Sequence, residues 1–329
     1  MDAVSRIAQA VLYEGHVLWP YRRSSLKNRE RWTFGRLHPE GRRGPDEAAA
    51  LQAQTLLETD GTARVALTLR FLHLVERGVH RHTPGGSEPV DTLEIDGRRY
   101  LAWDEATERH VEVAGTVPGD ATRTAFHVPA GQDEEPLAGA GGRIAGALVR
   151  TWCGLDGTVD LAGERVAPGL VRVTARVSNT TAWTDAAARG LACTFLATHL
   201  VLVARAGRWV SLTDPPAPWR PAAAACDNVG TWPVLVGEPG ERTTLLAAPI
   251  VLYDYPRIAP ESPGDFFDAT EIDELLVLNV LGLTDAERQE MAASDPRARE
   301  IVERCAALSA DDLMRLHGAL RDPRATARG

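Results

Sequence analysis

The chain has 329 residues, of which 44% are hydrophobic and 25% charged, a composition typical of a globular protein that can bury a substantial core. Its formal net charge of −9 argues against a general binder of nucleic acids or anionic membranes, because both need a basic face. The four cysteines are widely spaced and form no CxxC pair, which favours reduced thiols in the cytoplasm over a disulfide framework or a cysteine-rich zinc site.

No stretch predicts insertion into a membrane. The longest apolar run, at residues 245–252, is far shorter than the roughly 20 residues that cross a bilayer. The start of the chain carries Asp2 and Arg6 before only a short apolar stretch, unlike a secretory signal peptide. We therefore expect no membrane insertion.

The N-terminal part predicts one short helix followed by a basic segment. Val4, Ile7, Ala8 and Val11 share one face of a helix over residues 3–12. Residues 20–43 then hold eight Arg or Lys residues against two Glu residues, with aromatic residues interleaved. Such a mixture suits a protein interface, an intramolecular contact with an acidic segment, or stacking against nucleic acid.

The following region predicts β-strands. From residue 63 apolar residues recur at every second position, as expected for a half-buried strand over 65–72. Asp96-Gly97 stands between two short strand-like runs, which is a strong hairpin signal, and residues 109–113 suggest another strand.

Residues 129–142 are rich in Pro, Gly and acidic residues, which favours a boundary between two β units. Beyond it we expect strands near residues 144–155, 170–177, 195–203 and 209–212, with a hairpin turn at Gly207. Many short strands with Gly- and Pro-rich turns predict a mainly β fold of antiparallel, sandwich-like units.

The C-terminal part predicts helices. Thr284 precedes Glu287 by three residues and Ser309 precedes Asp312 likewise, as in a capping box. Ile301, Val302 and Cys305 follow at helical spacing. The expected organisation is an N-terminal segment and first β unit (1–140), a second β unit (141–282) and C-terminal helices (283–329).

No strong catalytic or cofactor motif is present: GxSxG, P-loop, HExxH and EF-hand signatures are all missing from the sequence. His73, His80 and His82 are weak candidates for a metal site, because an i, i+2 pair on a strand shares one face. Alternatively, these histidines have a structural role or lie in a solvent-exposed turn. We expect no bound cofactor or metal.

An acidic run is the more conspicuous feature. Residues 254–290 hold ten Asp or Glu residues against two Arg residues. The acids could favour helix N-termini, form an anionic surface for a partner, or supply paired catalytic carboxylates. The last alternative corresponds to a hydrolase or carbohydrate-binding sandwich that uses Asp and Glu residues near 265–274.

Three stretches carry a family resemblance: residues 13–35 (YEGHVLWPYRRSSLKNRERWTFG), 228–241 (NVGTWPVLVGEPGE) and 250–276 (IVLYDYPRIAPESPGDFFDATEIDELL). They resemble an uncharacterised bacterial family encoded beside nickel–iron hydrogenase genes, especially those of the high-affinity type in actinobacteria. The resemblance spans residues 3–320 and implies a role in hydrogenase maturation or assembly, without assigning functional residues.

The leading hypothesis is thus a cytoplasmic, non-catalytic accessory protein that contacts a hydrogenase subunit or another maturation protein and binds no nucleic acid. We expect residues 13–35 to pack beside 253–276, so that both build one composite surface. The residues expected to contact the partner are Trp19, Tyr21, Arg22, Lys27, Arg29, Arg31, Trp32, Tyr253, Tyr255, Asp268, Glu271, Asp273 and Glu274.

Overall fold

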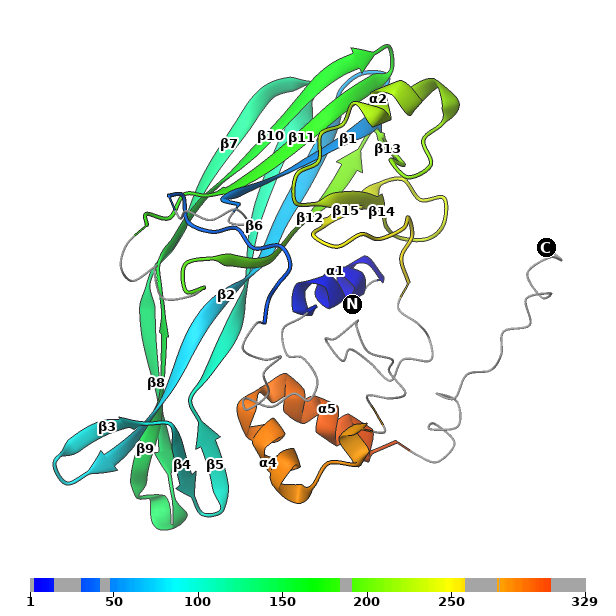
Figure 1. Cartoon of the computed structure of the whole chain (residues 1–329). Helices are drawn as coiled ribbons and strands as arrows, with labels where there is room; N and C mark the ends of the chain where they lie inside the picture. Colours follow the sequence, from blue (N-terminus) through cyan, green and yellow to red (C-terminus); the bar gives the residue numbers. More distant parts are fainter. Residues whose placement is uncertain are drawn as a thin grey trace.

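A computed structural model describes residues 3–14, 31–41, 48–183, 191–257, 277 and 279–308, and confirms the mainly β, antiparallel architecture (Figure 1). The strands are β1 (Ala50–Glu58), β2 (Ala63–Thr83), β3 (Gly86–Val90), β4 (Thr92–Ile95), β5 (Arg98–Leu101), β6 (Trp103–Val117), β7 (Gly119–Val128), β8 (Gly131–Ala138), β9 (Ile144–Trp152), β10 (Leu155–Ala167), β11 (Leu170–Asn179), β12 (Phe195–Arg205), β13 (Arg208–Val210), β14 (Trp232–Leu235) and β15 (Thr244–Ala248). The α-helices are α1 (Ala3–Tyr13), α2 (Arg220–Ala224), α4 (Asp285–Ser294) and α5 (Pro296–Ala306).

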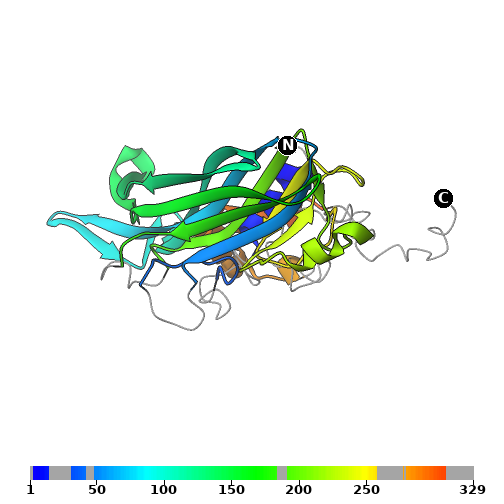
Figure 2. The same ribbon diagram turned by 90° about the horizontal axis from the view of Figure 1, so that it is seen from above.

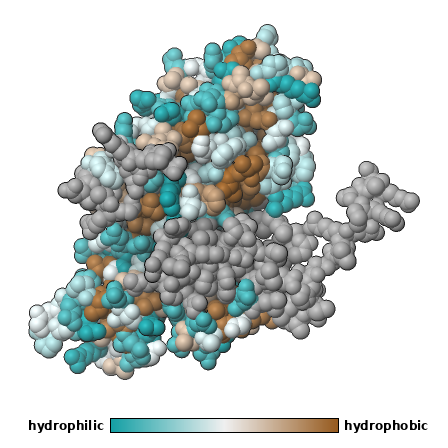
Figure 3. Space-filling view, viewed as in Figure 1, coloured by the Kyte–Doolittle hydropathy of each residue, from teal (hydrophilic) through white to brown (hydrophobic). Residues whose placement is uncertain are grey.

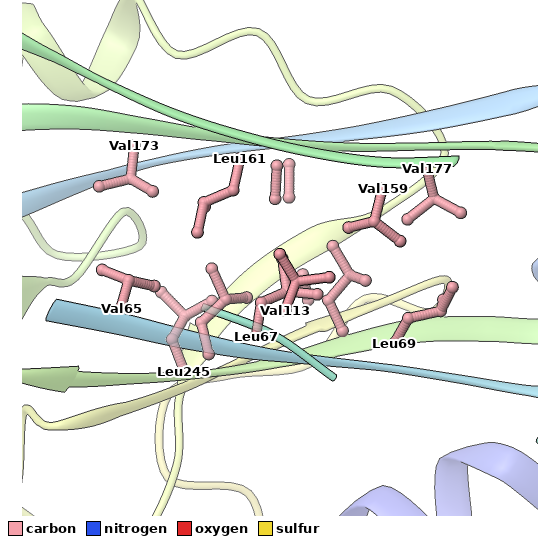
Figure 4. Close-up of a cluster of buried hydrophobic side chains, with 14 of the residues drawn as sticks. Val65, Leu67, Leu69, Val113, Val159, Leu161, Val173, Val177 and Leu245 are labelled. Carbon is pink, nitrogen blue, oxygen red and sulfur yellow. The ribbon is translucent and has the colours of Figure 1, made fainter. Parts of the chain in front are cut away.

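Two sheets face each other and form a sandwich, as the view from above shows (Figure 2). The first has the order β13-β1-β11-β10-β7, and the second runs β14-β15-β12-β2-β9-β8, with β3 and β6 also paired to β2. Alternate residues of both sheets point inward, and their apolar side chains meet between the sheets (Figure 4). Val159 and Val173 belong to the first sheet, and Leu67 and Leu245 to the second.

Strand β2 is the longest element and belongs to two parts of the molecule. Its first half pairs with β12 on one edge and β6 on the other, inside the sandwich. Its second half continues beyond the sandwich and pairs with β9 and β3. This second half, with β3, β4, β5, β8 and β9, forms a distal lobe (Figure 1) around a small apolar cluster that includes Val79, Leu93 and Leu148.

Helices cover the outer face of the larger sheet. The apolar face of α1, with Ala8 and Val11, packs on Val234 and Leu246. Helices α4 and α5 form a second cluster with β2 and the end of α1, built from residues such as Leu12, Leu72, Met291 and Ile301. The architecture is therefore three layers: sheet, sheet and helices.

A buried arginine ties the helices to β2. Arg77 Nη2 donates to the carbonyl oxygens of Ala293 (3.1 Å) and Ser294 (3.0 Å), the last residues of α4. The last carbonyls of a helix have no partner within the helix, so the guanidinium supplies the missing donors. Arg77 also pairs with Glu105 at 2.7 Å, which keeps its charge compensated.

Several sequence predictions are confirmed. The helix expected at 3–12 is α1, and the Asp96-Gly97 turn joins β4 to β5 with positive φ at both turn residues. Thr284 and Glu287 form the expected capping box at the start of α4, and α5 carries Ile301 and Cys305. The capping box expected at Ser309 lies outside the described residues.

The strands differ from the expected ones in three places. Residues 131–138, inside the segment expected to separate two β units, form β8, which pairs along β9, because charges and proline also suit a strand at a sheet edge. No strand was expected over 156–167, but Leu155–Ala167 forms β10. The chain does turn near Gly207, but β13 pairs with β1 and not with β12.

The strand order also does not follow the expected division at residue 140. Each sheet takes strands from both sides of that position, since β1 pairs with β11 and β2 pairs with β12. Among the described helices, none is long and apolar enough to cross a membrane.

We predict that Arg77→Met lowers the free energy of unfolding by about 3 kcal/mol, because it leaves buried carbonyls without their donor and removes one of the two arginines that pair with Glu105. Chemical denaturation followed by circular dichroism measures this change. Arg81→Met is the control: Arg81 lies on the same strand in an exposed pair with Glu88, where a change of about 0–1 kcal/mol is expected. Equal losses in the two variants would contradict the anchoring role of Arg77.

Candidate interaction surface

Exposed apolar side chains flank the β14–β15 ladder. Val229 is 48% exposed, Trp232 45%, Val251 72% and Tyr253 85%, and we call these four residues the β14–β15 patch. Val229 precedes the first residue of β14 by three positions, and Val251 follows the last residue of β15 by three. Because Trp232 pairs with Ala248, both flanking segments leave the ladder at the same end. Figure 3 shows apolar surface over this region.

The exposure of Trp232 follows from strand alternation. Trp232 and Val234 lie on the outer face of the sheet, whereas Leu235 points into the sandwich. Helix α1 covers Val234 but leaves Trp232 partly uncovered. A half-exposed indole is a common anchor at interaction sites.

The segment after β15 is held in place by Asp254. Its carboxylate accepts hydrogen bonds from Ser211 Oγ (2.5 Å), Thr213 Oγ1 (2.8 Å) and the backbone N–H of Leu235 (2.8 Å). Tyr255 adds a bond from its N–H to the carbonyl oxygen of Leu235 (2.7 Å). These contacts fix the backbone directly after Tyr253, whose side chain is exposed.

These same contacts close the free edge of β14. Leu235 has its N–H and carbonyl oxygen occupied by Asp254 and Tyr255, and Pro233 has no N–H to donate. An added strand would find few free backbone groups here. The patch therefore offers side chains, and not a strand edge, to a partner.

Arg31 and Trp32, expected at a partner surface, are instead buried inside the protein. The Arg31 guanidinium lies over the rings of Trp32 and Trp103, 4.1 and 3.9 Å from their centroids, and donates to the carbonyl oxygen of Asp104. Burial lowers the pKa of Arg31 to about 10, although the charges of Asp104 and Asp295 oppose the shift. The correction has a simple reason: aromatic and Arg side chains stack equally well in a core and at an interface.

The remaining candidates divide into two groups. Tyr253 is exposed, whereas Tyr255 is half-buried and donates its hydroxyl to the carbonyl oxygen of Glu241 (3.0 Å). Outside the described residues lie Trp19, Tyr21, Arg22, Lys27, Arg29, Asp268, Glu271, Asp273 and Glu274. The carboxylates near 265–274, on which the hydrolase alternative depends, also lie there.

The composite surface expected from residues 13–35 and 253–276 stays a prediction, but the described flanks of these stretches converge. A Cβ built at Gly35 would lie 2.9 Å from Cγ of Pro249, so the two backbones approach closely. Trp32 and Val277 belong to one hydrophobic cluster. The second and third resemblance stretches also meet, because Leu235 bonds to Asp254 and Tyr255.

The three histidines do not converge. His73 is fully buried, and its odd separation from His80 places the two side chains on opposite faces of β2. Burial, together with the nearby charge of Arg109, lowers the pKa of His73 to about 4. Within the described ranges, no three His, Cys, Asp or Glu side chains gather in a way that could hold a metal ion.

A polar cluster centred on Glu108 joins α1, β2, β6 and α5. Glu108 accepts hydrogen bonds from Tyr13 (2.5 Å) and Gln9 (2.7 Å), and lies 3.4 Å from both Arg70 and Arg297. Burial favours a raised Glu108 pKa, but these donors and positive charges outweigh it and lower the pKa. Burial and the bond to Glu108 raise the Tyr13 pKa. The pKa values of both groups are thus shifted away from neutral pH, whereas a general acid or base works best with a pKa near it. The cluster therefore suits a structural link better than acid–base catalysis.

Sequence reasoning missed Val229, Trp232, Val251 and Asp254 as site residues. The family resemblance could have pointed to them, because Val229 and Trp232 lie in the 228–241 stretch, and Val251 and Asp254 lie in the 250–276 stretch. The sequence does not reveal that the ladder brings these stretches together. The chain matches no protein-family model, and no curated protein matches it.

We predict that the stabilising effect of Glu108 depends on pH. Its pKa is depressed on folding, so its contribution is present above the ordinary value of 4.5 and is lost as the pH falls through the folded value. Glu108→Gln should therefore be less stable than the wild type at pH 7, and the difference should shrink as the pH falls below 4.5. Thermal midpoints measured across this range test the effect, and a difference independent of pH would contradict it.

Proposed function

We propose that the protein is a non-catalytic accessory protein that binds another protein through the β14–β15 patch. The observation that carries the proposal is the exposed Tyr253 next to the anchored Asp254, together with exposed Trp232, Val229 and Val251 on the segments of the β14–β15 ladder. Aromatic anchors dominate the binding energy of many interfaces, and a backbone fixed before binding loses less entropy on association.

The partner we propose is a nickel–iron hydrogenase subunit or another protein of hydrogenase maturation, in the cytoplasm. Support comes from the resemblance of residues 228–241 and 250–276, since the patch is built from these two stretches. A role in recognition explains why exposed apolar residues concentrate there, whereas the fold itself would be served by polar ones.

The acidic balance of the chain supports a protein partner over nucleic acid. The closed edge of β14 supports recognition by side chains, and a shallow apolar surface of this kind fits a complementary apolar surface on a folded partner.

We predict that Trp232→Ala combined with Tyr253→Ala weakens binding to a purified hydrogenase subunit by at least about 30-fold, because two aromatic anchors are lost. Titration calorimetry measures the affinity. The free energy of unfolding should change by less than about 1 kcal/mol, since both residues are exposed.

Ile144→Ala is the matched control, because Ile144 is 41% exposed but lies in the distal lobe, and its affinity should equal that of the wild type. Unchanged binding of the double variant would remove the patch from the proposal. Failure of the wild type to bind any hydrogenase subunit or maturation protein would reject the proposed partner.

A further inference from the structure

Two cysteines lie where two strands meet end to end on β2. Strand β6 occupies one edge of β2 from Ala63 to Arg77, so β12 and β9 must share the other edge. Strand β12 begins opposite His73, and the pairing with β9 starts at Glu76, opposite Thr151 near the end of β9. The chain before β12 and the chain after β9 therefore run into the same small gap. Cys193 and Cys153 lie on these two segments.

The strand register brings the two cysteines into the same neighbourhood, although 39 residues separate them in the chain. Cys193 belongs to the apolar cluster between the sheets, and Cys153 packs against this cluster and against the cluster under the helices. Asn179 Nδ2 donates to the carbonyl oxygen of Cys193 at 2.9 Å and so fixes the backbone at this position.

The two cysteines differ in access to solvent. Cys153 is half-buried, whereas Cys193 is buried. Burial, followed by the contact with Cys153 and the charge of Glu76, raises the pKa of Cys193 to about 12. Because the thiolate is the reactive form, an oxidant in solution meets Cys153 first, with Cys193 held against it as the second thiol.

We propose that Cys153 and Cys193 form a reversible disulfide when the protein meets a hydroperoxide. The Cys153 thiolate attacks one peroxide oxygen and breaks the O–O bond, which gives a sulfenic acid and a hydroxide ion that takes up the thiol proton as water. The Cys193 sulfur then attacks the Cys153 sulfur, and the sulfenic hydroxyl leaves with the Cys193 proton as a second water. One hydrogen peroxide is reduced to two waters, and two thiols are oxidised to one disulfide.

The conversion of Cys153 to a neutral sulfenic acid also favours the second step. The negative charge that helps to hold Cys193 in its protonated form is removed when Cys153 is oxidised. The new bond joins the end of β9, in the distal lobe, to the start of β12, in the sandwich. Oxidation thus cross-links the two parts that β2 otherwise connects.

The test treats the full-length protein with hydrogen peroxide, blocks free thiols with iodoacetamide and digests with trypsin without reduction. Cleavage after arginine places the two cysteines in separate peptides, 151–165 and 190–205. Mass spectrometry should find these two peptides cross-linked, and dithiothreitol should release them. In Cys193→Ser, dimedone should label Cys153 as the trapped sulfenic acid.

Cys226→Ser and Cys305→Ser serve as controls. Cys226 is half-buried in a separate cluster, and Cys305 is buried in the cluster under the helices, against which Cys153 also packs. Loss of either should leave the cross-link intact. Cys193→Ala replaces Cys193→Ser if the latter loses its near-ultraviolet circular dichroism. The proposal is overturned if the wild type yields only sulfinic acid at Cys153, only disulfides between two molecules, or a faster reaction at Cys226 or Cys305.

Discussion

The hydrogen bonding of β2 along both edges is the constraint on which the rest of the structure depends. Twenty-one residues in one continuous strand serve as the template for β6 and β3 on one edge and for β12 and β9 on the other. No β-bulge interrupts the pairing with β6, so alternate residues stay on the same face of the strand through most of its length. The first half therefore presents Leu67 to the sandwich, and the second half presents Arg77 to α4.

The fold class and most strands could be predicted because apolar alternation is clear wherever one face of a strand meets the core. The alternation is lost in β10 for a physical reason. Gly157 and Gly163 look like turn residues, yet a Cβ at these positions would lie 2.3 Å from Phe126 and 2.5 Å from Val117. Both glycines are needed where large side chains approach the backbone of a strand.

The candidate site was only partly predictable for a related reason. Composition can identify Arg31 and Trp32 as residues that stack, but it cannot say whether the stack is internal or at an interface. Tyr253 was assigned from sequence and is exposed, whereas Trp232 needed the strand register to be placed on the outer face of the sheet. Contacts between residues far apart in the chain are the information that local pattern does not contain.

The packing of α1 on β14 and β15 has a consequence for synthesis on the ribosome. Helix α1 is made well before Val234 and Leu246, which cover its apolar face and lie near the end of the β region. Pairings between such distant segments form slowly, and exposed apolar surface attracts chaperones and other nascent chains meanwhile. Until β14 and β15 have been made, the apolar face of α1 therefore lacks the strands that bury it in the finished fold.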